Sequence, residues 1–132
     1  GRPGAYDNLE KVVLSPNVTK ISTAAFSDID ALKSINLNNV QIIENAAFAD
    51  SGVESVTFEN EELEIGEYAF ESCIGLTSIS IPGTISKIHD GAFNESGLTS
   101  VILNEGTKSI GEVVWNSDAS IESFPVKFYF YM

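Results

Sequence analysis

The dipeptide Ala-Phe recurs along this chain at nearly constant spacing, and this repetition constrains the fold more than any other feature. Successive aromatic residues lie 22, 22, 23 and 22 residues apart, in four Ala-Phe copies and one degenerate copy: Ala25-Phe26, Ala47-Phe48, Ala69-Phe70, Ala92-Phe93 and Val114-Trp115. A unit of about 22 residues cannot bury its own apolar face, so it must stack on its neighbours. The repeat therefore predicts a solenoid.

Other positions keep the same phase. An isoleucine precedes each aromatic residue by five positions: Ile21, Ile43, Ile65, Ile88 and Ile110. Each unit also carries a short segment of alternating character: Leu9 to Leu14, Leu32 to Leu37, Val53 to Phe58, Leu76 to Ile81, Leu98 to Leu103 and Ile121 to Val126. Alternation with period two is typical of a strand with one buried face. Because these segments occupy equivalent positions, we expect a parallel sheet of about six short strands.

The residues around each Ala-Phe pair predict a helical turn. Three residues before each aromatic stands an acidic or helix-capping residue: Thr23, Asn45, Glu67, Asp90 and Glu112. Such residues suit the first turn of a helix, where backbone N–H groups lack partners. The second and fourth units are one residue shorter after the aromatic and contain Ser51-Gly52 and Ser96-Gly97. We expect glycine to supply backbone angles that shorten this turn.

The stretch from Ile65 to Pro82 reads IGEYAFESCIGLTSISIP and closely resembles the BspA-type leucine-rich repeat. The resemblance covers almost all of Leu9 to Val126. It implies an α/β leucine-rich-repeat solenoid whose parallel sheet lines the concave face, with short helical turns or loops opposite. It further implies a secreted or cell-surface protein of a host-associated microbe, with a role in adhesion and in binding host macromolecules. The resemblance carries over no catalytic residues and no cofactor.

Length and composition bound the remaining choices. The 132 residues suit a single domain, of five to six units over residues 9–126 with an apolar tail, 127–132. We expect this tail to cap the last strand or to form a final strand, the alternative being a dimer contact. The sequence starts at Gly1, so we expect a processed product, and the absence of an export signal says nothing about localisation.

Charge and residue inventory exclude several classes of function. With 19 acidic and 7 basic side chains the net charge is −12, which argues against nucleic-acid and anionic-lipid binding. No run of 18 apolar residues exists, so we expect no membrane insertion. One histidine, His89, and one cysteine, Cys73, cannot make a zinc site, and no nucleophile-elbow motif accompanies His89. We therefore predict no enzyme activity and no cofactor.

The third unit is rich in acidic residues: Glu54, Glu59, Glu61, Glu62, Glu64, Glu67 and Glu71. The favoured interpretation is a solvated face that keeps the solenoid soluble, and the alternative is calcium binding. No Asp-x-Asp-x-Asp-Gly loop is present to support calcium binding.

The strand register predicts three columns of side chains that point outward from the sheet. The first column is mostly serine and contains Lys11, Ser34, Ser55, Ser78, Ser100 and Ser123. We interpret its serines as structural residues of the repeat, and the alternative is a row of hydrogen-bonding groups that binds a ligand. The second contains Val13, Asn36, Thr57, Ser80, Ile102 and Pro125; the third contains Ser15, Asn38, Glu59, Pro82, Asn104 and Lys127. These two columns vary between units, as binding surfaces do. Their candidate partner-binding residues are Asn36, Asn38, Thr57, Glu59, Ser80, Ile102 and Asn104.

The combined prediction is a non-catalytic binding module of a secreted or cell-surface protein. Its partner would be a protein or glycan of a host or neighbouring cell, bound weakly or multivalently. The alternative hypothesis is a structural spacer or self-assembly element of a larger surface protein. We expect a monomer or a weak homo-oligomer.

Overall fold

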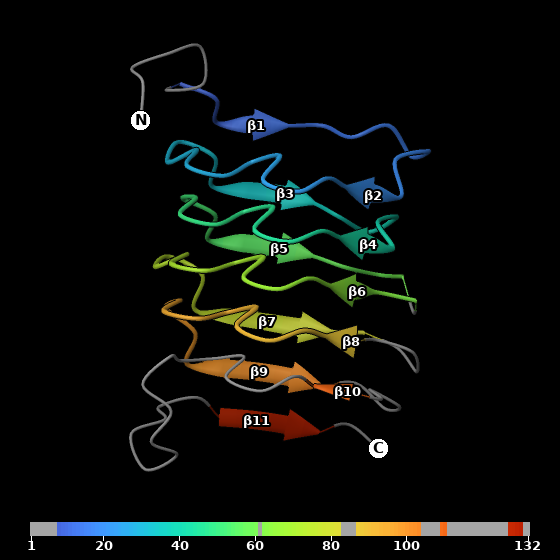
Figure 1. The fold of residues 1–132 in the computed structure, drawn as a ribbon, viewed down its shortest axis with the longest axis vertical. Helices are drawn as coiled ribbons and strands as arrows, with labels where there is room; N and C mark the ends of the chain where they lie inside the picture. Colours follow the sequence, from blue (N-terminus) through green and yellow to red (C-terminus); the bar gives the residue numbers. More distant parts are fainter. Residues whose placement is uncertain (1–7, 61, 83–86, 104–108, 111–126, 131–132) are drawn as a thin grey trace.

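The chain forms a parallel β-solenoid in which each unit makes one coil of the stack (Figure 1). This computed structural model describes residues 8–60, 62–82, 87–103, 109–110 and 127–130. Odd-numbered strands form one wall of the coil: β1 Lys11–Val12, β3 Ser34–Asn36, β5 Ser55–Thr57, β7 Ser78–Ile81, β9 Ser100–Leu103 and β11 Lys127–Phe130. Even-numbered strands form a second wall: β2 Lys20–Ile21, β4 Ile42–Ile43, β6 Glu64–Ile65, β8 Lys87–Ile88 and β10 Ser109–Ile110. The second wall was not predicted from the sequence.

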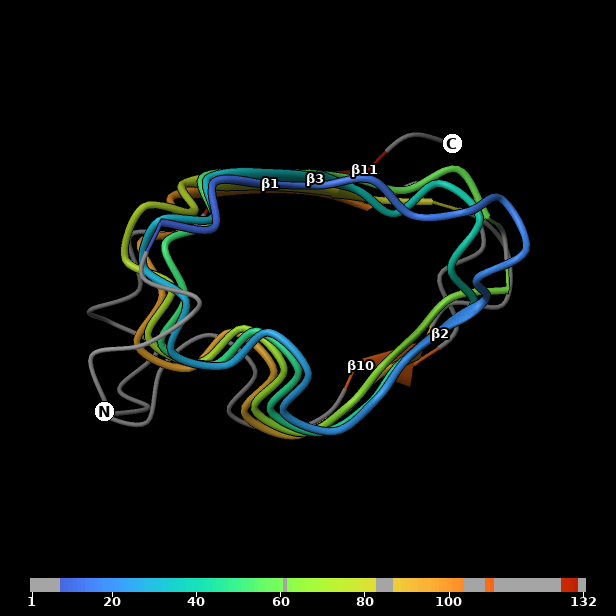
Figure 2. The same ribbon diagram turned by 90° about the horizontal axis from the view of Figure 1, so that it is seen from above.

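All recorded strand pairs are parallel and connect equivalent residues of successive coils. The even strands make one five-stranded sheet in the order β10-β8-β6-β4-β2. The odd strands make two ladders, β1-β3-β5 and β11-β9-β7, rather than the single six-stranded sheet that was predicted. Seen along the stack, the coils superpose closely, so the odd-strand wall runs nearly straight and is not visibly concave (Figure 2).

The last strand of the odd wall comes from the tail of the chain. Lys127 pairs with Ser100 and Tyr129 with Ile102 in the register between β11 and β9. Residues 127–130 of the tail thus form a strand beside β9. The predicted strand from Ile121 to Val126 and the degenerate Val114-Trp115 copy lie outside the described residues.

The segments around Ala-Phe are turns, and no helix occurs among the residues that the structure describes. The N–H groups of Ala24, Phe26 and Asp28 donate to carbonyl groups of the next coil, whereas those of Ala25 and Ser27 donate within their own turn. In an α-helix every N–H group beyond the first turn would donate to the carbonyl four residues earlier in the same segment. Alternate residues donate to the next coil here, as in a strand, so the described segments are turns and the predicted helical turns are not confirmed.

Backbone angles reflect this alternation. In each turn the residues two before and two after the phenylalanine have positive φ: Ala24, Asp28, Ala46, Asp50, Tyr68, Ser72, Gly91 and Glu95. Left-handed residues at both positions interrupt the right-handed backbone angles that a continuous α-helix requires.

The core runs along the stack axis between the walls. The anchor isoleucines Ile21, Ile43, Ile65 and Ile88 are buried, which confirms their predicted inward orientation. Phe48, Phe70 and Phe93 are fully buried and stack as a continuous column, with ring centroids 5.1 to 5.3 Å apart. Phe26 extends this column at 5.3 Å from Phe48. Each ring therefore fills the space between its own coil and the next.

Glycine is needed in the second and fourth units because the backbones of two coils approach each other closely there. It does not supply the unusual backbone angles that the sequence led us to expect. Neither Gly52 nor Gly97 has positive φ. A Cβ atom at Gly52 would lie 1.9 Å from the carbonyl oxygen of Asp30, and one at Gly97 would lie 1.9 Å from that of Ile74. The shorter coils lie so close to the longer ones that no side chain fits at these positions.

Candidate interaction surface

The odd-strand wall presents the candidate residues to solvent. Asn36, Thr57 and Ser80 are exposed, and Ile102 is half-buried. Between them along each strand lie inward residues such as Ile35 and Ile79, which are 4% and 3% exposed. The period-two alternation of a strand directs these two sets to opposite faces. We call this outward surface, formed by the first, second and third columns, the sheet face.

Register confirms that the columns are aligned. Ser34 pairs with Ser55 and Asn36 with Thr57 between β3 and β5. Ser78 pairs with Ser100 and Ser80 with Ile102 between β7 and β9. In the third column Glu59 is exposed, Asn38 and Pro82 are half-buried, and Asn104 lies outside the described residues.

One candidate side chain also shapes the backbone. The side-chain oxygen of Asn36 accepts a hydrogen bond from the backbone N–H of Asn38 at 2.9 Å. This contact forms the local turn typical of asparagine and ends strand β3. A substitution at Asn36 would therefore alter the turn as well as the surface.

The backbone register of β11 differs from the one predicted for the end of the odd wall. Lys127 pairs with Ser100 at the register position that the sequence assigned to Ser123, and Tyr129 pairs with Ile102 at the position assigned to Pro125. Lys127 was expected in the third column. The alternating character of residues 127–130 indicates a strand. The repeat spacing instead favoured Ile121 to Val126 as the strand of this unit, so residues 127–130 were not predicted to pair at this position.

A hollow of about 360 Å³ lies at the β1 end of the sheet face. Its lining includes Lys11, Val13, Ser34 and Asn36 from the outward columns, together with Asn39 from the loop after β3. Val13 is 82% exposed, so an apolar side chain stands beside amide groups. Asn39 was not among the candidates, because the column rule considers only strand positions.

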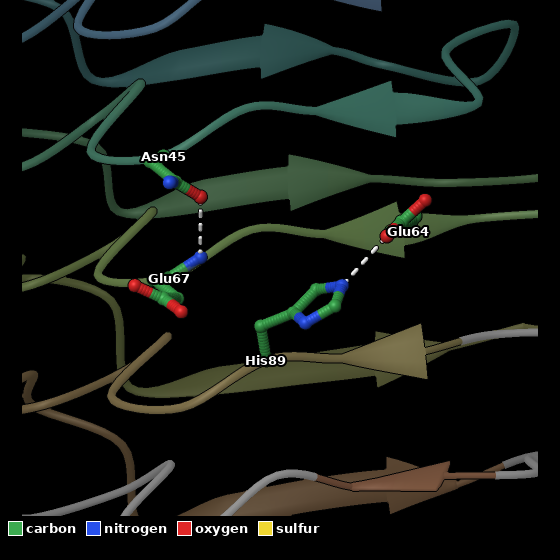
Figure 3. A network of polar contacts seen from close by, with 4 residues as sticks. All are labelled: Asn45, Glu64, Glu67 and His89. Carbon is green, nitrogen blue, oxygen red and sulfur yellow. Dashed lines mark hydrogen bonds and ion pairs between the residues drawn. The ribbon is translucent and has the colours of Figure 1, made fainter.

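A second hollow, of about 420 Å³, lies on the even-strand wall. Within it the Nε2 atom of His89 lies 2.6 Å from Oε1 of Glu64, and both side chains are more than 40% exposed (Figure 3). The side-chain oxygen of Asn45 accepts a hydrogen bond from the backbone N–H of Glu67 at 2.9 Å, so Asn45 ties two coils together. No serine or cysteine lines this hollow, so His89 has no such nucleophile beside it there.

Two titratable groups are perturbed by their surroundings. Burial raises the pKa of the Cys73 thiol, and its Sγ–H donates to the carbonyl of Phe48 at 3.1 Å. The residue packs as a small core side chain, as expected. Burial, followed by the charges of Asp50 and Glu95, raises the pKa of the Glu71 carboxyl.

The described residues contain no group of three or more histidine, cysteine, aspartate or glutamate side chains placed to hold a metal ion. They also contain no helix long and apolar enough to span a membrane.

The fold and this surface define a class of protein, the repeat solenoid that displays side chains on a parallel sheet. The particular family follows from a sequence comparison, which finds six copies of the BspA type leucine rich repeat region over residues 5–122. The chain belongs to this family. Its repeats form, in general, protein-interaction scaffolds without catalytic function. No curated protein and no solved structure matches the chain.

Proposed function

We propose that this chain is a non-catalytic module that binds a protein partner through the sheet face, at the cell surface or after secretion. The observation that carries the proposal is the aligned set of outward side chains in the second column, which differs from coil to coil: Asn36, Thr57, Ser80 and Ile102. Buried neighbours hold these positions in place, so the surface is preorganised and loses little freedom on binding.

Charge supports this face over the rest of the molecule. The first two columns carry no carboxylate, although the net charge of the chain is −12. A partner that docks over these two columns therefore desolvates no carboxylate of theirs, which would cost free energy. The described side chains of these columns also include no tryptophan or arginine anchor. We expect a weak interaction that several copies in a larger protein would strengthen, as in adhesion.

The test uses paired variants on opposite walls. The chain is immobilised and exposed to a panel of purified extracellular proteins and, in parallel, to a glycan array. Each binder is then measured against Ser55→Arg/Thr57→Arg, two exposed positions of β5 on the sheet face, and against Thr19→Arg/Gln41→Arg, two exposed positions next to the even-strand wall. Both pairs add the same charge and similar bulk.

We expect the sheet-face pair to weaken protein binding by at least tenfold, about 1.4 kcal/mol, and the control pair to leave it nearly unchanged. Equal affinities for both pairs would place the site elsewhere. Binding to glycans alone would show that the partner class is wrong.

A further inference from the structure

The odd-strand wall is divided between β5 and β7. Figure 1 shows these strands as neighbours, yet among the described strands β5 pairs only with β3, and β7 only with β9 and not with β5. The even-strand wall has no such interruption, because β6 pairs with β4 on one side and with β8 on the other. Strand pairing is therefore lost on one wall and kept on the other. We call the unpaired boundary between β5 and β7 the seam.

The segments that lead from each phenylalanine turn into the next odd strand, which we call corners, alternate in length. The first and third corners have five residues and the second and fourth have four: residues 29–33, 51–54, 73–77 and 96–99. Where a longer corner precedes a shorter one, the shorter corner donates two backbone N–H groups to it: Gly52 to Ile29, Glu54 to Lys33, Gly97 to Cys73 and Thr99 to Thr77. At the seam the order is reversed, and a shorter corner precedes a longer one.

The pair of corners at the seam has no such bonds. No backbone hydrogen bond joins residues 51–54 to residues 73–77, and the N–H of Leu76 donates instead to Cys73 within its own corner. A Cβ atom at Gly75 would lie 3.7 Å from the nearest backbone atom, compared with 1.9 Å at Gly52 and Gly97 in the bonded pairs. The backbones at the seam are therefore less closely packed.

The core is also less well covered at the seam. Val56 of β5 is only partly buried, whereas its equivalents Ile35 and Ile79 in β3 and β7 are 4% and 3% exposed. The N–H of Ser55 and the carbonyl of Thr57 bond toward β3. Because alternate residues of a parallel strand bond to opposite neighbours, the N–H and carbonyl groups of Val56 face β7, with which β5 does not pair.

We propose that the seam is the point at which this solenoid opens, with β5 and β7 separating while the even-strand wall holds the stack together. A repeat stack is stabilised by the interfaces between neighbouring units, so the interface with the fewest bonds opens at the lowest free energy. Opening would move Thr57 away from Ser80 on the sheet face, and a partner that contacts both would favour the closed state. The inference concerns the stack and does not rest on the proposed binding function.

Amide hydrogen exchange of the folded wild-type chain tests the proposal, because equivalent N–H groups make equal bonds at different interfaces. The N–H of Asp50 donates to Glu71 at 2.8 Å at the edge of the seam. The N–H of Ser72 donates to Asn94, also at 2.8 Å, where the corners that follow are bonded to each other. After correction for intrinsic rates, we expect the Asp50 amide to exchange roughly tenfold faster than the Ser72 amide, or more.

A disulfide across the seam provides the second arm of the test. Ser55→Cys/Ser78→Cys places one thiol on β5 and one on β7, and Ser34→Cys/Ser55→Cys is the matched control across the paired strands β3 and β5. All three serines are exposed members of the first column. The seam disulfide should slow exchange at Asp50 to about the rate of Ser72, whereas the control disulfide should leave exchange at Asp50 unchanged.

Three results would overturn the proposal. They are equal protection of Asp50 and Ser72 in wild type, protection of the Val56 amide as strong as that of Ile35, and a seam disulfide that leaves exchange at Asp50 unchanged. Far-UV circular dichroism and intact mass verify that each variant is folded and oxidised. If the seam disulfide does not form, the two comparisons in wild type decide the question without it.

Discussion

Replacing Phe70 with alanine should destabilise the solenoid more than the same truncation of Phe26, the partly buried ring in the first coil. The Phe70 ring is fully buried and lies between Phe48 at 5.1 Å and Phe93 at 5.3 Å, with interplanar angles of 0° and 7°. Its removal leaves a void that spans two coil interfaces. The packed backbone on either side limits how far this void can collapse.

The magnitude follows from burial and ring contacts. Truncation of a buried phenylalanine costs about 3–5 kcal/mol. Each aromatic pair contributes roughly 0.5–1.5 kcal/mol beyond burial, and Phe70 loses two such pairs, so we expect the upper part of that range. Phe26 is partly exposed and stacks on one described ring, that of Phe48. Phe26→Ala should therefore lower the free energy of unfolding by about half as much as Phe70→Ala.

Urea denaturation followed by circular dichroism measures the free energy of unfolding of wild type and both variants. Comparison of m-values shows whether each variant still unfolds as one unit, since stacked repeats can lose cooperativity. Equal losses for Phe70→Ala and Phe26→Ala, or a loss below about 1 kcal/mol for Phe70→Ala, would refute the stacked-ring account.

Three further outcomes are expected. The Cys73 thiol should react with a thiol reagent at a rate limited by unfolding, because its raised pKa keeps it protonated in the core; rapid labelling of the native chain would contradict this. Glu71→Gln should stabilise the fold at pH 7 but not well below its ordinary pKa of 4.5. The raised pKa means that the folded state binds this proton more tightly, so stability falls as pH rises from about 4.5, and a pH-independent difference in melting temperature would count against it. Gly52→Ala should cost at least about 2–3 kcal/mol, since its Cβ would meet a backbone carbonyl. Gly75→Ala, where the nearest atom belongs to a flexible side chain, is the matched control and should be milder in the same melts.

The candidate site was predictable to the extent that it follows strand alternation. The spacing placed Asn36, Thr57 and Ser80 on one outward face, and the ladders align them with their neighbours. The hollow that adds Asn39 depends on how the loop after β3 folds against the first coil, which no periodicity encodes. Tyr129 is in backbone register with Ile102 because residues 127–130, which follow the segment favoured by the repeat spacing, form the strand that pairs with β9.

The sequence alone determined the repeating coil, the inward isoleucines and the column of phenylalanine rings. These features follow from spacing, because a 22-residue unit that stacks in register must bring equivalent residues together whatever their detailed conformation. The chemistry of a capping residue followed by alanine suggested a helix, since local propensity was the only information available.

Tertiary structure decided the conformation of those turns, the second wall of strands and the position of the last strand. The N–H groups around each ring could bond within their own coil or to the next, and the neighbouring coil supplied carbonyl groups at the right distance. Backbone hydrogen bonds between coils depend on residues some 22 positions away, so local sequence cannot specify them. The sequence determined which residues stack on one another, and the hydrogen bonds between coils determined the backbone conformation of each turn.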